Sequence, residues 1–102
     1  MAGKNTKKKT AVAHYTVPGL TDQQGLELAS ALQDRLHALN DLQLVLKHAH
    51  WNVTGRGFIS VHEMLDPQVE LVRGFVDEVA ERIATLGYAP NGLSGAIVAE
   101  RS

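Results

Sequence analysis

The stretch LDPQVELVRGFVDEVAERIATL, residues 65–86, decides the fold. Its apolar residues alternate between steps of four and three, which places them on one face of an α-helix. They are Leu65, Val69, Val72, Val76, Val79, Ile83 and Leu86. Pro67 falls near the start of this pattern and allows two interpretations. Either it lies inside the helix and kinks it, or the helix begins there, with Asp66 as its N-cap. We expect a helix over about residues 60–87, bent near Pro67, capped by Ser60 with Glu63 and ended by Gly87.

A second helical pattern precedes this one, over about residues 21–53. Thr21 and Gln24 have the spacing of a capping box, in which Thr21 is the N-cap and Gln24 bonds back to it. The stripe that follows is Leu28, Leu32, Leu39, Leu42, Leu46, Ala49 and Val53. Further leucines lie beside the stripe, so this helix needs cover from more than one direction. Paired glycines at 55 and 57 predict a turn between the two helices, and hence an antiparallel hairpin.

The rest of the chain adds little regular pattern. Residues 11–20 predict an extended lead-in that ends in a turn at Pro18 and Gly19, residues 88–92 predict a loop, and residues 93–102 have no clear period. We therefore expect an all-α fold of two long antiparallel helices. Two such helices cannot bury their own apolar faces, so a partner or a longer chain must supply the missing layer.

Composition excludes several classes of protein. The 102 residues include no Cys, which excludes a disulfide scaffold, a Cys-type zinc module and a cysteine nucleophile. No apolar run approaches the roughly 18 residues of a membrane span. The charged start is not followed by the apolar segment of a secretory signal, so a cytoplasmic location is expected.

The net charge of −1 conceals an asymmetry. Residues 1–9 carry four lysines and no acid, namely Lys4, Lys7, Lys8 and Lys9, whereas the rest of the chain carries six Lys or Arg against eleven Asp or Glu. We expect residues 1–15 to form a disordered basic arm and residues 16–102 to form the folded part. Such an arm either binds DNA through its phosphates, without reading sequence, or is a solubilising tail.

Candidate metal ligands lie beside the apolar stripe of the second helix. At about 100° per residue, His62, Asp66, Asp77 and Glu81 all fall within roughly a quarter turn. Both His62 with Asp66 and Asp77 with Glu81 are i, i+4 pairs, and imidazole with carboxylate suits iron, manganese or zinc.

Distance separates these two pairs. Asp66 and Asp77 lie about 16 Å apart along a helix, whereas metal–ligand bonds are about 2 Å. Two copies of the helix, packed antiparallel about a two-fold axis near Val72, would bring each pair to face the other pair of its partner. One interface would then form two identical sites.

Two residues near the end of the first helix extend this hypothesis. His50 flanks the apolar face and adds a second imidazole, and Trp51 is either a packing residue or a redox-active neighbour of the site. His48 points elsewhere and is expected to be solvated. The alternative is a helical dimerisation fragment without activity, because acids at helical spacing are also typical of a solvated face.

Three blocks carry a family resemblance: KHAHWNV at residues 47–53, GFISVHEMLD at 57–66 and DEVAERIATLG at 77–87. Together they resemble the Dps family, DNA-binding proteins from starved cells, within the ferritin-like superfamily. The resemblance covers roughly residues 16–100. It implies a four-helix bundle that assembles into hollow dodecamers, oxidises Fe(II) preferably with hydrogen peroxide, stores ferric iron and binds DNA non-specifically at the nucleoid.

The resemblance also assigns roles to residues. It implies a dinuclear iron site at a two-fold interface, with Zn²⁺ as a competitor, formed by His50, His62 and Asp66 of one chain and Asp77 and Glu81 of the other. Trp51 would be its redox neighbour, and the lysine-rich arm matches members that bind DNA through flexible termini. A ferritin-type iron store without DNA binding is the nearest alternative. The family's last two bundle helices are absent, so we expect this chain to be the first hairpin of the bundle.

Overall fold

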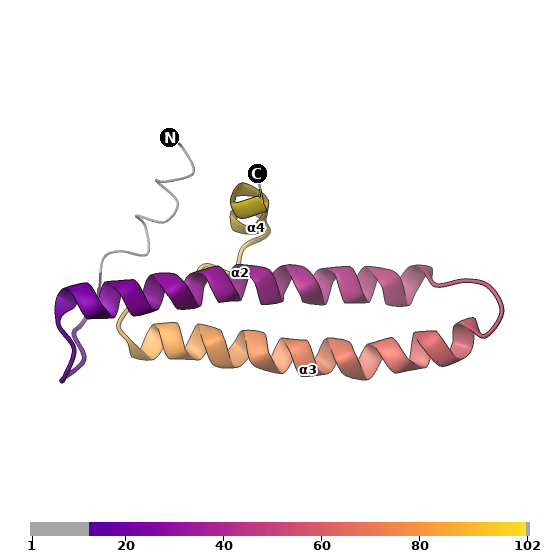
Figure 1. Ribbon diagram of the computed structural model, residues 1–102, viewed down its shortest axis with the longest axis horizontal. Coiled ribbons are helices and arrows are strands. Elements are labelled where there is room, and N and C mark those ends of the chain that lie inside the picture. Colours follow the sequence, from indigo (N-terminus) through magenta and orange to yellow (C-terminus); the bar gives the residue numbers. More distant parts are fainter. Residues whose placement is uncertain (1–12, 102) are drawn as a thin grey trace.

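The computed structural model describes residues 13–101, and three helices lie within this part of the chain (Figure 1). Helix α2 spans Asp22–Asn52, α3 spans Phe58–Thr85 and α4 spans Ser94–Arg101. Helices α2 and α3 lie antiparallel and side by side, and α4 lies against α2 on the side away from α3. The Cα atoms extend over 55 × 31 × 15 Å, so the molecule is little more than one helix layer thick.

The start of α2 follows the sequence prediction. Thr21 is the N-cap, its side chain accepts a hydrogen bond from the Gln24 backbone N–H at 3.1 Å, and the Thr21 N–H donates to Gln24 Oε1 at 3.0 Å. This reciprocal pair satisfies two of the backbone donors that every helix start leaves without an intrahelical partner. The predicted capping box is confirmed.

The start of α3 differs from the prediction. The helix begins at Phe58 after Gly57, which has φ +77° and makes no side-chain cap bond. The proposed cap by Ser60 and Glu63 is therefore wrong, and so is the alternative start at Asp66. Helix α3 continues through Pro67, which is exposed together with Glu63 one turn earlier. Because proline removes the N–H that would bond to the Glu63 carbonyl, an exposed position lets water hydrate that carbonyl instead.

The end of α3 is a Schellman motif. Gly87 has φ +93°, the Tyr88 N–H donates to the Ile83 carbonyl at 3.3 Å, and the Gly87 N–H donates to the Ala84 carbonyl at 3.0 Å. Glycine is favoured here because it adopts the left-handed conformation without a Cβ penalty. The predicted end of the helix at Gly87 is confirmed.

The apolar stripe of α3 faces α2 as predicted. Leu65, Val69, Val72, Ile83 and Leu86 are buried, and Val76 and Val79 are partly buried. The stripe predicted for α2 is partly wrong, because Leu28 and Leu42 are each 43% exposed, whereas Gly25, Ala29 and Leu36 are buried. Apolar residues cover more than one side of α2, so spacing alone does not select the side that meets α3.

The tail also differs from the prediction, because residues 94–101 form α4 where no period was evident. An eight-residue helix gives too short a window for a period to stand out, and α4 is held by tertiary contact: Ala96 and Ile97 are buried. Large apolar side chains remain exposed on all three helices, among them Leu44, Leu71 and Val98. This agrees with the expectation that the hairpin leaves apolar surface uncovered.

The lead-in to α2 packs across the end of α3. The His14 N–H donates to the Gly87 carbonyl and the Tyr15 hydroxyl donates to the Ala84 carbonyl, both at 2.6 Å. These two residues were placed in the basic arm, so the arm's predicted boundary at residue 15 is too late. The rest of the arm prediction concerns residues 1–12, which lie outside the described residues. Within residues 13–101, none of the helices has the length and apolarity needed to cross a membrane.

Candidate metal centre

Two histidines meet at the turn that joins the long helices. His50 lies in the last turn of α2 and His62 near the start of α3. The intervening turn reverses the chain through Gly55 and Gly57, both with positive φ. The imidazole rings stack, with centroids 3.7 Å apart and planes at 20° to each other. His50, predicted as a second imidazole, is thus brought to His62 within one chain.

Each ring is held by the backbone of the other histidine. His50 Nδ1 lies 2.8 Å from the His62 carbonyl oxygen, and His62 Nδ1 lies 2.8 Å from the His50 carbonyl oxygen. A carbonyl oxygen can only accept, so each Nδ1 carries a hydrogen and donates it. In the neutral rings the lone pair is then on Nε2, which is the form that binds a metal ion. The hairpin therefore prepares two imidazole ligands.

Asp66 follows His62 by one turn of α3 and is paired with Lys47 of α2. Lys47 Nζ lies 2.8 Å from Asp66 Oδ1, and both side chains are partly exposed. The hydrogen bond from Lys47 lowers the pKa of Asp66 below its usual 3.8; partial desolvation opposes this, and the charges of Lys47, His50 and His62 lower it further. Asp66 is therefore ionised near neutral pH, as a metal ligand must be.

Lys47 was missed as a site residue by sequence reasoning. It lies three residues before His50, which puts it near the same face of α2 as His50. The spacing from His50 could have indicated Lys47 as a site residue. Its pairing with Asp66, however, depends on how α2 and α3 align in the hairpin.

The other two predicted ligands do not lie near His50, His62 and Asp66. Asp77 and Glu81 lie further along α3, where both are exposed. In residues 13–101 of one chain, no three His, Cys, Asp or Glu side chains form a group that could hold a metal ion. The assignment of the five ligands stays a prediction that requires a second copy of the chain.

Trp51 and His48 lie on the side of α2 that faces α4. They line a cavity of about 440 Å³ together with Val98 and other residues of the two helices. Trp51 is 70% exposed. His48 is exposed as expected, and the Asn52 side chain bonds to its carbonyl oxygen at 2.8 Å. The structure places Trp51 next to His50 in the chain and does not test its predicted redox role.

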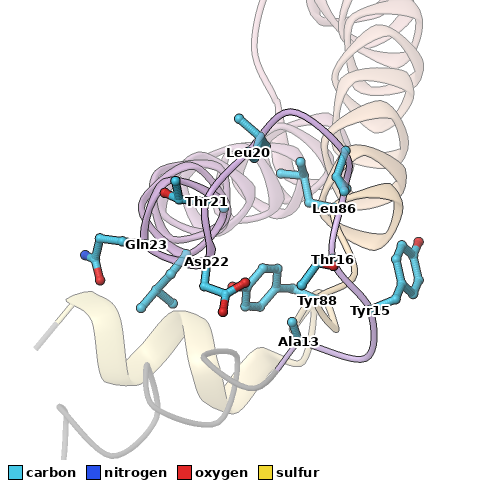
Figure 2. A pocket seen from close by; sticks show the side chains of 12 residues that line it. Ala13, Tyr15, Thr16, Leu20, Thr21, Asp22, Gln23, Leu86 and Tyr88 are labelled. Atoms are coloured by element: carbon cyan, nitrogen blue, oxygen red, sulfur yellow. The ribbon is translucent and has the colours of Figure 1, made fainter.

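The cavity shown in Figure 2 lies at the opposite end of the hairpin. It has a volume of about 370 Å³ and is lined by the lead-in, the start of α2 and the end of α3, including Tyr15, Leu20 and Leu86. Among the described residues that line it, Asp22 is the one carboxylate and none is a histidine. The cavity is therefore separate from the candidate metal centre. The predicted DNA-binding residues, Lys4, Lys7, Lys8 and Lys9, lie outside the described residues.

The family model of the ferritin-like domain matches residues 29–101. The chain belongs to the ferritin-like family. It is also 60% identical over 88 residues to a DNA protection during starvation protein of Mycolicibacterium smegmatis, covering 86% of this chain and 48% of that protein. The Dps resemblance and the all-α ferritin-like fold are thereby confirmed.

Two further similarities concern a curated protein and a solved structure. The fine tangled pili major subunit of Haemophilus ducreyi is 65% identical over 89 residues, covering 87% of this chain and 47% of that protein. The structure of DpsA14 from Streptomyces coelicolor superimposes with a TM-score of 0.83 at 58% identity, covering 88% of this chain and 54% of that one.

The structure of Mycobacterium smegmatis Dps also has a TM-score of 0.83 at 58% identity, covering 89% of this chain and 52% of that one. This ferritin-like chain spans about half the length of the curated relatives it matches.

Proposed function

We propose that this ferritin-like chain belongs to a Dps-type ferroxidase that takes Fe(II) as its substrate and oxidises it with hydrogen peroxide. The observation that carries the proposal is the reciprocal bonding of His50 and His62, which leaves both Nε2 lone pairs available, with ionised Asp66 one turn after His62. Two imidazoles and one carboxylate are a ligand set suited to iron. Zn²⁺ favours the same ligands and would compete with it.

The site is completed by a second copy of the chain. Asp77 and Glu81 of the partner would supply two more carboxylates, with α3 of the two copies antiparallel about an axis near Val72. Asp66 lies six residues before Val72 and Asp77 five residues after it, so the two pairs are spaced almost symmetrically, as a two-fold axis requires. The exposure of Asp77 and Glu81 in the single chain supports their use at an interface.

The chemistry balances with two Fe(II) ions per peroxide. Each Fe(II) loses one electron, the O–O bond of hydrogen peroxide breaks, and two protons complete two water molecules, so that no hydroxyl radical is released. The carboxylates favour the ferric product, which is more highly charged, while the imidazoles hold the ferrous substrate. Trp51, beside His50, would absorb stray oxidising equivalents. The ferric product would be stored as mineral inside a dodecamer formed by the complete protein.

DNA protection is the second part of the proposal. The relative from Mycolicibacterium smegmatis is named a DNA protection during starvation protein. Lys4, Lys7, Lys8 and Lys9 would bind DNA phosphates without sequence preference, and many arms on one assembly would raise the effective concentration. The protein would then act in the cytoplasm, at the nucleoid. Deletion of residues 1–9 should abolish salt-sensitive retardation of DNA; unchanged retardation would place the DNA site elsewhere.

The iron site is tested by changing both His62 and Asp66 to Ala in the 102-residue chain. We expect rapid peroxide-driven oxidation of Fe(II) to be lost, while the helical circular dichroism is retained. His48→Ala is the matched control, because His48 is an exposed histidine of α2 at the same end of the hairpin. Oxidation at the parent rate in the double variant would refute the assignment. The mass of the assembly, measured in the same samples, shows whether the second copy is present.

A structural role is the competing candidate, favoured by one observation. The 65% identical relative from Haemophilus ducreyi is named a major pilus subunit. In that case the chain would be a helical association module whose carboxylates are only solvated. It would assemble without stoichiometric Fe(II) binding, whereas the ferroxidase binds two Fe(II) per interface site. A ferritin-type iron store would oxidise Fe(II) but would not retard DNA.

A further inference from the structure

A buried glutamine ties α2 to the loop that follows α3. Gln33 is 5% exposed, its Nε2 donates to the Asn91 carbonyl at 2.9 Å, and its Oε1 accepts from the Asn91 N–H at 2.9 Å. Because the backbone supplies one donor and one acceptor, the orientation of the Gln33 amide is unambiguous. Asn40 adds a third bond to the same loop, from its Nδ2 to the Gly92 carbonyl at 3.0 Å. We call the Gln33–Asn91 pair the clamp.

His37 lies one turn beyond Gln33 and takes the remaining amide hydrogen. His37 is 6% exposed, and its Nε2 lies 3.1 Å from Gln33 Nε2. Since Gln33 Nε2 is the donor of the clamp, His37 Nε2 must accept, and the neutral ring carries its hydrogen on Nδ1. Among residues 13–101 this buried Nδ1 has no hydrogen-bonding partner. Protonation of His37 therefore adds a hydrogen to Nε2, the atom that faces the amide hydrogens of Gln33.

Charged side chains surround the cavity that His37 lines. His37 lines a cavity of about 240 Å³ between α2 and α4. Its charged lining residues are Asp34 and Asp41 from α2 and Glu100 and Arg101 from α4, and α3 contributes no lining residue. Arg101 pairs with Asp41 at 3.4 Å.

The helix that follows the clamp is short. Helix α4 has eight residues, and a helix of that length is marginal without tertiary support. Its described contacts include the buried Ala96 and Ile97 and the Arg101–Asp41 ion pair with α2. Loss of the clamp therefore acts on a helix that depends on tertiary packing.

We propose that His37 is a proton-operated release for the loop of residues 88–93 and for α4. With neutral His37 the clamp is closed. Protonation of the ring sets two N–H groups against each other, so the Gln33 amide turns away and Asn91 loses both its bonds. The released state exposes Ala96 and Ile97, which are buried while the clamp is closed.

The test measures hydrogen exchange of the Asn91 amide, whose hydrogen lies in the clamp, on the metal-free 102-residue chain at pH 7.5 and 5.5. After correction for the intrinsic pH dependence of exchange, we expect protection of Asn91 and of the α4 amides to fall at least about tenfold at pH 5.5. His37→Gln keeps an acceptor but cannot gain a proton, so its protection should not change with pH. His48→Gln, which removes an exposed histidine of the same helix, should behave as the parent.

Two results would overturn the proposal: pH-independent protection in the parent, or an undiminished loss of protection in His37→Gln. A second measurement does not depend on any variant. Ring ¹⁵N shifts of His37 in the parent should show hydrogen on Nδ1 at pH 7.5 and on both nitrogens at pH 5.5. Hydrogen on Nε2 at pH 7.5 would refute the arrangement on which the release depends.

Discussion

Replacement of Gly87 by Ala should destabilise the hairpin far more than the same change at a glycine of similar conformation. Gly87 has φ +93°, and a Cβ built there would overlap the carbonyl oxygen of Tyr15 and lie 3.1 Å from its carbonyl carbon. Gly19 has φ +91° but has nothing within 4 Å of a built Cβ. The two positions share the backbone penalty and differ in the clash, which makes Gly19→Ala the matched control.

The magnitude follows from the contacts of the lead-in. The left-handed conformation costs a non-glycine residue about 1–2 kcal/mol at either position. At Gly87 the lead-in must also move away, which breaks the His14–Gly87 and Tyr15–Ala84 hydrogen bonds, each contributing about 0.5–1.5 kcal/mol. Gly87→Ala should therefore lower the free energy of unfolding by about 2–5 kcal/mol, and Gly19→Ala by about 1–2 kcal/mol.

Thermal unfolding followed by circular dichroism at the helix band measures this difference. About 1 kcal/mol shifts the Tm of a domain of this size by about 4–8 °C, so Gly87→Ala should melt at least about 4 °C below Gly19→Ala. In a chain lacking residues 1–16 the clashing backbone is gone, and the extra effect of Gly87→Ala should disappear. Equal melting temperatures for the two alanine variants in the full chain would refute this account of the lead-in.

Three other predictions concern the site, the core and the helix start. Lys47→Met should return the pKa of Asp66 toward its usual 3.8, and carboxyl chemical shifts would detect this change. A group whose pKa is lowered by folding contributes stability that is lost as the pH falls through that pKa. The parent should therefore lose more stability than the variant below about pH 4. An unchanged Asp66 titration would exclude Lys47 as the cause. Ile83→Ala, at a fully buried position, should lower the free energy of unfolding by about 2–5 kcal/mol in denaturant titrations. Leu71→Ala, at a 60% exposed position, should change it by less than about 0.5 kcal/mol. Similar losses of unfolding free energy in the two variants would show that the buried face of α3 is misplaced. Thr21→Ala should lower the free energy of unfolding by about 0.5–2 kcal/mol through loss of the capping box, and Thr54→Ala in the turn serves as its control.

Local signals in the sequence predicted most of the hairpin. The stripe from Leu65 to Leu86 identified the inner face of α3, Thr21 with Gln24 identified the start of α2, and Gly87 identified the end of α3. Each depends on residues within one or two helical turns, where spacing determines geometry. The start of α3 was misplaced, because its N-cap is Gly57, which has no side chain to signal a cap.

The features that were missed depend on contacts between distant residues. Lys47 meets Asp66 across the hairpin, Gln33 meets Asn91 58 residues later, and α4 is held by packing on α2. None of these contacts has a fixed sequence separation, so no local pattern in the sequence predicts it. The same limit applied to His50 and His62: their identities suggested ligands, but their mutual backbone bonds depend on how the two helices align.

The reciprocal bonds of His50 and His62 also constrain the length of the turn between them. A slip of one residue in the pairing of α2 with α3 would rotate one ring by about 100° relative to the other helix and break both bonds together. The connection of residues 53–57 therefore fixes the helical register on which both imidazoles depend. An inserted or deleted residue there, although it lies in an exposed turn, should disable the pair as completely as loss of a histidine, whereas surface loops elsewhere usually accept such changes.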